Sequence, residues 1–256
     1  MSLTDSLLIY HRFRSGIAED LSGNSRSLEE VGTSTTYGPI GTKALQGTGA
    51  LFTKSAGHYL RRPGDDSVFD FGSGSFTISL WVKLTATTSE QNLTEKFDTM
   101  TGPGWTLYKK SSDHVEFYHS GGVTLTSSST LSAGTWYHIF LRRNGSAWTL
   151  HINNSSEAST TSAAAITDTT QQLRLGHRNE NDGRNFPLDG IMDEYAIWSR
   201  ALSDDEKSEV YNSGVGKFLL GTKVGRSSNF EAGGTSGVKS WIGSDLYGGG
   251  GYAGSY

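Results

Sequence analysis

The chain carries, at residues 188–206, the sequence LDGIMDEYAIWSRALSDDE, and the first half of this stretch has the pattern of a β-strand. Ile191, Tyr195 and Ile197 share one face by period-two alternation, among aromatic and β-branched residues that favour strands. Asp193 falls on the same face. A buried carboxylate is costly unless it is paired, hydrogen-bonded or bound to a metal, so the sequence predicts a specific partner for Asp193.

The second half of the stretch has the pattern of a helix start. Ser203 is placed to cap the free backbone N–H groups while Glu206 reaches back toward it, which is the S-x-x-E capping box. The two aspartates between them suit the positive end of the helix dipole. We expect a short helix that runs to about Asn212, with Gly214 placed to end it.

The rest of the chain has the pattern of short strands joined by turns. Glycine is abundant, at 33 residues, and proline is scarce, at 4. Residues 76–84 show the clearest alternation, with Thr77, Ser79, Trp81 and Lys83 between apolar residues, which predicts a half-buried strand. Many short strands and one late helix favour a two-sheet sandwich. We expect further strands at 7–13, 45–52, 58–61, 93–97, 105–109, 115–119, 123–126, 136–143, 148–153 and 172–176.

Four motifs in a fixed order resemble one family of domains. They are DLSGN at 20–24, GSFTISLWVK at 74–83, GTWYHI at 134–139 and the strand–helix stretch at 188–206. Together they resemble the laminin-G-like domains of the concanavalin A-like lectin/glucanase superfamily. The resemblance implies an all-β, two-sheet jelly-roll sandwich with one short late helix. The composition changes at about Lys217, so we assign residues 1–216 to the sandwich and residues 217–256 to a Gly-rich C-terminal arm.

The resemblance also implies a structural calcium ion. Asp20, the Gly23 carbonyl, Asn24 and Asp193 match positions where relatives hold an ion between the first turn and the closing strand. Calcium prefers oxygen ligands from carboxylates and carbonyls, which this set supplies. The alternative is that Asp20 begins an Asx-turn and that Asp193 caps a turn or accepts a hydrogen bond from an arginine.

A glycan-binding face is the second candidate site. Sugars bind to aromatic platforms combined with planar hydrogen-bonding side chains. The polar loop at 177–185 has this chemistry, and aromatic residues of the 105–119 region are candidates to lie nearby; the alternative is an ordinary solvated loop beside a half-buried sheet. The predicted residues are His177, Arg178, Asn179, Asn181, Asp182, Arg184, Trp105 and Tyr118, with Tyr108 and His119 as possible neighbours.

Catalysis is the third candidate, and the sequence argues against it. Glycosidases need two carboxylates that flank the bond, and the glucanases of this fold carry them as E-x-D-x-x-E on one strand. That motif does not occur here: Glu116 is isolated on its strand, and alternation points Asp193 and Glu194 to opposite faces. The G-x-S-x-G nucleophile motif is also missing from the sequence. We predict that the protein is not an enzyme.

Composition narrows the partners. The net charge of −4 gives no reason to expect a nucleic acid, and no apolar run approaches the ~20 residues of a membrane-spanning helix. With no cysteine, the chain has neither a disulfide framework nor a thiolate metal site. Residues 1–13 lack the pattern of a signal peptide.

The segment 217–256 is rich in Gly and Ser and cannot fold alone. Trp241 and Tyr247 are suited to anchor it either on its own domain or on a neighbouring subunit, and we favour the neighbouring subunit. We therefore predict a non-catalytic binding, adhesion or structural protein on a phage virion surface: a decoration, fibre or tail protein. Its partners would be other virion or assembly subunits, in an oligomer, and surface glycans. The alternative is a carbohydrate-binding module of a secreted bacterial protein, located outside the cell.

Overall fold

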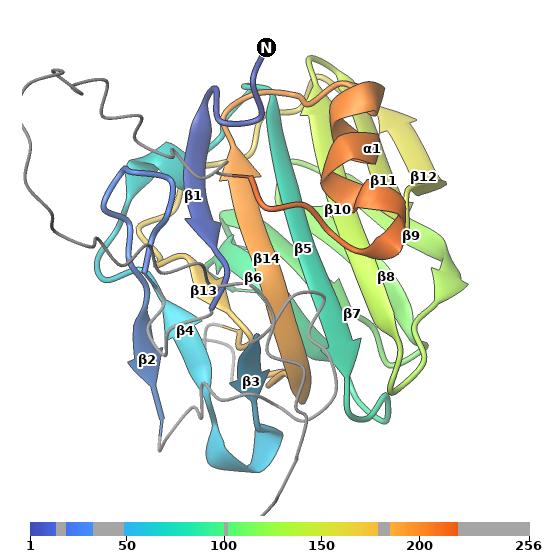
Figure 1. The fold of residues 1–256 in the computed structure, drawn as a ribbon. Coiled ribbons are helices and arrows are strands. Elements are labelled where there is room, and N and C mark those ends of the chain that lie inside the picture. The colour runs from blue at the N-terminus through green and yellow to red at the C-terminus, as the bar shows by residue number, and fades with distance from the viewer. Residues whose placement is uncertain (14–18, 33–48, 100–101, 179–184, 220–256) are drawn as a thin grey trace, which may run out of the picture. The chain divides into compact units, whose positions relative to one another are not determined.

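A computed structural model describes residues 1–13, 19–32, 49–99, 102–178 and 185–219 (Figure 1). These residues form two antiparallel seven-stranded sheets. Sheet A has the strand order β1-β14-β5-β10-β11-β12, with β3 also paired to β14, and sheet B has the order β2-β4-β13-β6-β7-β8-β9. The all-β, two-sheet sandwich predicted from the sequence is therefore confirmed.

Twelve of the fourteen strands in the described ranges overlap a predicted strand, and the two that were not predicted are Glu29–Val31 and Ser155–Thr161. Sheet A contains β1 (Leu7–His11), β3 (Ala50–Phe52), β5 (Phe76–Leu84), β10 (Trp136–Asn144), β11 (Ala147–Ile152), β12 (Ser155–Thr161) and β14 (Gly190–Trp198). Sheet B contains β2 (Glu29–Val31), β4 (Tyr59–Arg61), β6 (Gln91–Phe97), β7 (Gly104–Lys109), β8 (His114–His119), β9 (Val123–Thr130) and β13 (Arg174–Leu175). The helix α1 spans Asp204–Tyr211, and short 3-10 turns lie at Lys54–Ala56, Ser67–Phe69 and Asn212–Gly214.

The main hydrophobic core lies between the two sheets. Its centre is aromatic: the Trp148 ring lies 5.9 Å from Phe76 in an edge-on contact and 5.7 Å from Phe117 in a stacked contact. Trp105 belongs to the same core and is fully buried, and its indole N–H donates to the Phe69 carbonyl at 3.0 Å. The prediction that Trp105 helps to bind a glycan is therefore wrong, because its ring is part of the packing between the sheets.

Strand β5 is buried on both faces, which differs from the half-buried strand that alternation predicted. Ile78, Leu80 and their alternate neighbours face the main core, as expected. The other face is covered in part by the end of α1 and by the segment that follows the helix, which crosses β5 (Figure 1). There the Trp81 ring stacks on Tyr211 of the helix at 5.7 Å, and the Thr77 hydroxyl donates to the Arg200 carbonyl at 2.9 Å.

A β-bulge in β14 changes which face its carboxylates occupy. The register against β5 shifts between Asp193 and Ala196, and Glu194 has a positive φ of 48°. Asp193 consequently pairs with Trp81 on the outer face of sheet A, whereas Tyr195 points into the main core. The predicted common face of Asp193 and Tyr195, and the predicted opposition of Asp193 and Glu194, are both wrong because the bulge inserts one residue.

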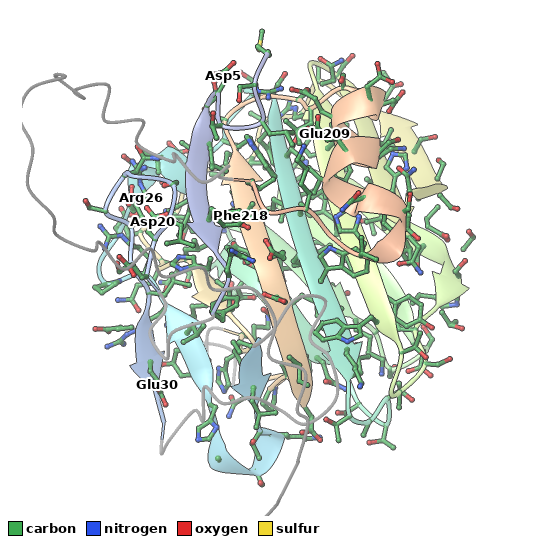
Figure 2. All side chains as sticks on the ribbon, viewed as in Figure 1. Asp5, Asp20, Arg26, Glu30, Glu209 and Phe218 are labelled. Atoms are coloured by element: carbon green, nitrogen blue, oxygen red, sulfur yellow. The ribbon has the colours of Figure 1, made fainter. Side chains whose placement is uncertain are left out.

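The carboxylate of Glu194 belongs to a buried cluster on the outer face of sheet A. The Tyr10 hydroxyl donates to Glu194, and the Arg12 Nε donates to it at 3.1 Å. The Arg12 guanidinium in turn lies 3.8 Å from the centre of the Phe218 ring, and Leu219 is buried in the same region. Figure 2 shows Phe218 over β14. Residues at the start of the predicted C-terminal arm thus pack on the sandwich, while residues 220–256 lie outside the described ranges.

The helix α1 forms as predicted, with a different ending. Both halves of the capping box are present: the Glu206 N–H donates to the Ser203 hydroxyl at 3.2 Å, and the Ser203 N–H donates to the Glu206 carboxylate at 2.8 Å. Asn212, with φ 48°, is the left-handed residue that ends the helix, in place of the predicted Gly214. In the part of the chain that the structure describes, no helix has the length and apolar character that crossing a membrane requires.

Replacing Ser203 by Ala should destabilise the protein. The change removes the acceptor for one N–H group of the first helical turn, which typically costs about 1 kcal/mol. Urea unfolding followed by tryptophan fluorescence would measure the loss. Ser208→Ala, on the exposed side of the same helix, is the matched control and should change stability by less than about 0.5 kcal/mol. Equal losses for the two variants would contradict the capping role.

Candidate functional site

The outer face of sheet B carries a mixture of aromatic, charged and hydroxyl side chains. Alternation along β7 and β8 turns Leu107 and Phe117 inward, and therefore turns Thr106, Tyr108 and Tyr118 outward. These outward side chains do not belong to either hydrophobic cluster of the sandwich. A cavity of about 180 Å³ lies on this face. Its lining consists of Thr106, Tyr108, Glu116, Tyr118 and Arg178.

Glu116 is the acidic side chain of the cavity and is held by three donors. Lys110 Nζ and the Thr126 hydroxyl each donate to it at 2.7 Å, and the Tyr108 hydroxyl donates to its other oxygen. Burial alone would raise the pKa of Glu116, but these hydrogen bonds outweigh burial and lower it. The carboxylate is therefore ionised at neutral pH. Burial and Glu116 together raise the pKa of Tyr108, so the phenol keeps its proton.

Arg178 is the basic side chain of the cavity, and it is only 6% exposed. Its guanidinium lies 5.0 Å from the centre of the Phe97 ring and 5.4 Å from that of Phe186. Its backbone N–H donates to the Asn185 carbonyl at 2.8 Å. Stacking on two rings holds a planar guanidinium in one orientation, so the positive charge stands at a defined place in the wall.

A buried polar cluster supports the floor of the cavity. The Asn92 side-chain amide donates to Glu95 at 2.8 Å and to the Thr106 hydroxyl oxygen at 3.1 Å, and all three residues are almost fully buried. The Asn92 backbone N–H donates to the Phe186 carbonyl at 2.8 Å, which ties the segment beside Arg178 to β6. The amide N–H₂ group of Asn92 is thus used twice, while its Oδ1 is buried without a hydrogen-bond partner, so this polar network is only partly satisfied.

The structure brings together some of the predicted glycan-binding residues. Arg178 and Tyr118 line the same cavity, and Tyr108, named as a neighbour, belongs to the same lining. His177 is buried, and its ring stacks on Tyr59 at 4.8 Å. His119 is buried against Trp148. Asn179, Asn181, Asp182 and Arg184 lie outside the described residues.

Sequence reasoning missed two lining residues, Thr106 and Glu116. A signal for both was present. Strict alternation places Thr106 on the same face as Tyr108 in one strand, and Glu116 on the same face as Tyr118 in the next. The face that carries the predicted tyrosines therefore carries Thr106 and Glu116 as well.

The predicted calcium ligands near the first turn have other roles in this arrangement. The backbone N–H groups of Tyr10, Ser22 and Arg26 donate to the Asp20 carboxylate at 3.1, 2.9 and 2.8 Å. These hydrogen bonds outweigh burial and lower the pKa of Asp20. Asn24 points its N–H₂ group at the Leu8 carbonyl, at 3.0 Å. Figure 2 labels Asp20 and Arg26 in this turn.

The turn therefore has the Asx-turn geometry that was the alternative to calcium. Asp193 accepts a hydrogen bond from the Glu194 N–H at 2.8 Å, and Gly23 has φ 87°, which suits glycine in a turn. A cation at this place would have to replace N–H donors at Asp20 and rotate the Asn24 amide. Among the described residues, no three His, Asp or Glu side chains form a group able to hold a metal. Calcium binding stays a prediction.

The sandwich and its cavity define an antiparallel jelly-roll domain with an open, polar outer face on sheet B. The chain belongs to the concanavalin A-like lectin/glucanases superfamily, whose laminin G domain model matches residues 54–206. That match covers more than half of the chain and contains three of the four motifs, while DLSGN at 20–24 lies before it; the family resemblance is confirmed. No curated protein matches the sequence closely enough to count as a relative.

Several solved structures share the fold. The binding domain of Paraclostridial Mosquitocidal Protein 1 is similar with a TM-score of 0.64 and 21% identity, over 83% of this chain and 53% of that one. Domain 4 of AbnA, a GH43 extracellular arabinanase from Geobacillus stearothermophilus, in complex with arabinotriose, also has a TM-score of 0.64, with 17% identity over 83% and 98%. The binding domain of botulinum neurotoxin DC, in complex with rat synaptotagmin II, has a TM-score of 0.61 and 12% identity over 83% and 52%.

The chain thus spans about half the length of the toxin binding domains and nearly all of the arabinanase domain. At these sequence identities, the similarity shows a shared fold only. Each of these three structures is described as a binding domain or as a domain holding a bound sugar, rather than as a catalytic domain.

Proposed function

We propose that this protein is a non-catalytic binding domain that recognises carbohydrate at the outer face of sheet B. The observation that carries the proposal is the cavity in which an aromatic ring, Tyr118, stands beside two buried charged groups, Glu116 and Arg178. Sugars are recognised by this combination of a flat apolar surface and a few fixed polar groups. The arabinanase domain of the same fold, which holds arabinotriose, supports the choice of ligand class.

The state of Glu116 supports a role in binding rather than in catalysis. Glycoside cleavage needs a general acid, which is a carboxyl group with a raised pKa, opposite a second carboxylate. The lowered pKa of Glu116 makes it unsuited to donate a proton. Glu95 is on the same face but lies under the Asn92 amide, with 1% exposure. Glu116, which accepts from three donors, is therefore arranged as a hydrogen-bond acceptor and not as a proton donor to a bond in the cavity.

The same comparison supports a proposal for where the domain acts. An extracellular location, as the carbohydrate-binding part of a bacterial protein, is consistent with the extracellular arabinanase whose domain 4 is similar. The prediction of a phage virion component, assembled through residues 217–256, depends on a segment that falls outside the described residues beyond Leu219. It stays a prediction.

Binding to a glycan array, followed by titration calorimetry with the best oligosaccharide, tests the proposal. We expect wild-type protein to bind, and Tyr118→Ala to bind roughly tenfold or more weakly, since truncating an aromatic anchor of a binding site typically costs about 2 kcal/mol. Tyr137→Ala, a half-buried tyrosine of sheet A, is the matched control and should bind like wild type. Repeating the titration in calcium and in chelator tests the predicted ion. Failure of the wild type to bind any glycan would contradict the proposal.

A further inference from the structure

The hydrogen-bond directions inside the cavity are fixed, and they define what a ligand must offer. The Tyr108 hydroxyl uses its single hydrogen to donate to Glu116, so its oxygen presents only lone pairs to other groups. The oxygen of Thr106 accepts from the Asn92 amide, which leaves the Thr106 hydrogen to donate. The wall therefore holds an acceptor and a donor two residues apart on one face of β7.

The charges of the wall reinforce this pattern. Glu116 is ionised and paired with Lys110 at 2.7 Å, so that pair adds no net charge. Arg178 supplies a positive group on the lining, and the buried carboxylate of Glu95 lies beneath the floor, within reach of Asn92. Within the lining itself the charged side chains are Glu116 and Arg178, one of each sign. A ligand with a net negative charge gains little from such a balanced wall.

From this geometry we propose that the cavity selects a neutral sugar residue with free hydroxyl groups and discriminates against acidic sugars, with Glu116 acting as a positioning residue that locks Tyr108 as an acceptor. The inference rests on the proposed function and names its ligand class. A sugar hydroxyl can donate to Tyr108 while a neighbouring hydroxyl accepts from Thr106 or Arg178. A carboxylate can only accept, so it would meet the lone pairs of Tyr108 and the charge of Glu116 unfavourably.

The selection is tested with two probes of equal length: arabinotriose, which is neutral, and trigalacturonate, which is acidic. By calorimetry at neutral pH, wild-type protein should bind the neutral trisaccharide at least roughly tenfold more tightly than the acidic one. Tyr108→Phe removes the acceptor and should lower the affinity for the neutral sugar by roughly five- to tenfold, the usual effect of one lost hydrogen bond. Tyr137→Phe, outside the cavity, should leave both affinities unchanged.

Glu116→Gln tests the positioning role separately. A glutamine amide can donate to Tyr108 as well as accept from it, so the phenol is no longer held as an acceptor. We expect the ratio of neutral to acidic affinity to fall by roughly fivefold or more, which a purely structural role would not produce. Thermal unfolding of each variant shows whether it is folded, and Tyr108→Phe, a minimal change, keeps the test valid if Glu116→Gln does not fold.

The outcomes separate the two proposals. Binding of neither trisaccharide nor any arrayed glycan would overturn the proposed function. Binding that is weakened by Tyr118→Ala, but that shows equal affinity for neutral and acidic sugars or no effect of Tyr108→Phe, would overturn only the selection of neutral sugars.

Discussion

Acidification from about pH 7 to about pH 4.5 is expected to unfold the sandwich. Four buried histidines have lowered pKa values: about 4 for His11, His119 and His151, and about 3 for His138. Burial is the largest cause in each case, because the charged imidazolium loses its hydration. For His138 and His151 the nearby cationic Lys207 adds to the effect, and its Nζ lies 3.3 Å from the His151 ring.

Acidification lowers the stability because the pKa of each of these histidines is lower in the folded state than in the unfolded state. In the unfolded chain a histidine has a pKa near 6.5, so below this pH the unfolded state binds protons that the folded state does not. The four histidines therefore make their full contribution to the free energy of unfolding above about pH 6.5, and this contribution is lost as the pH falls toward 4. At about 1.36 kcal/mol per pKa unit, the four histidines together correspond to on the order of 10 kcal/mol, which is comparable to the whole stability of a domain.

Urea unfolding at a series of pH values would measure this dependence. Between about pH 6 and pH 4.5, the slope of the free energy of unfolding against pH should correspond to the uptake of nearly four protons on unfolding of the wild type. His138 is suited to a specific test: its Nε2 lies 2.8 Å from the Ser79 hydroxyl beneath α1, and it is fully buried. His138→Gln should reduce the slope by about one proton. A stability that stays constant down to about pH 4.5 would contradict the argument.

Alternation of apolar and polar residues predicts a strand only where one face of that strand is apolar, and this explains which strands could be predicted from the sequence. Residues 76–84 were predicted with their final bounds because five apolar residues alternate there. β12, at Ser155–Thr161, was missed because its residues are small and polar and give no periodic signal. It exists as a strand because it pairs with β11 along its whole length. Pairing between distant or weakly patterned segments is not encoded in the pattern of one segment.

The candidate site, too, could be predicted only in part from the sequence. The sequence indicated Tyr118 and Arg178 by residue type, and the structure places both on one cavity. It could not distinguish an aromatic residue of the core from one of the binding face, so Trp105 was misassigned. The faces of Asp193 and Glu194 depended on a bulge that a strict period of two cannot represent.

Replacing Glu194 by Ala should destabilise the domain by about 3–5 kcal/mol, the usual effect of removing one partner of a buried ion pair. The change leaves the Arg12 guanidinium buried, with its carboxylate partner lost and Phe218 still covering it. The Tyr10 hydroxyl loses its acceptor as well. Urea unfolding at neutral pH would measure the loss, and Tyr10→Phe, which keeps the ion pair but removes one hydrogen bond to the carboxylate, should cost less, about 2 kcal/mol.

The double variant Arg12→Met, Glu194→Met separates the ion pair from simple packing. Two apolar side chains of similar length remove both charges together, and such replacements are often neutral or stabilising. We therefore expect the double variant to be more stable than Glu194→Ala by at least about 2 kcal/mol. Phe218 packs on Arg12, and the N–H of the next residue, Leu219, lies 3.4 Å from the Tyr10 hydroxyl. Hydrogen exchange of the Leu219 amide should therefore be faster in Glu194→Ala than in the wild type, and slower again in the double variant. A double variant as unstable as Glu194→Ala would mean that shape, rather than charge, holds this face of sheet A together.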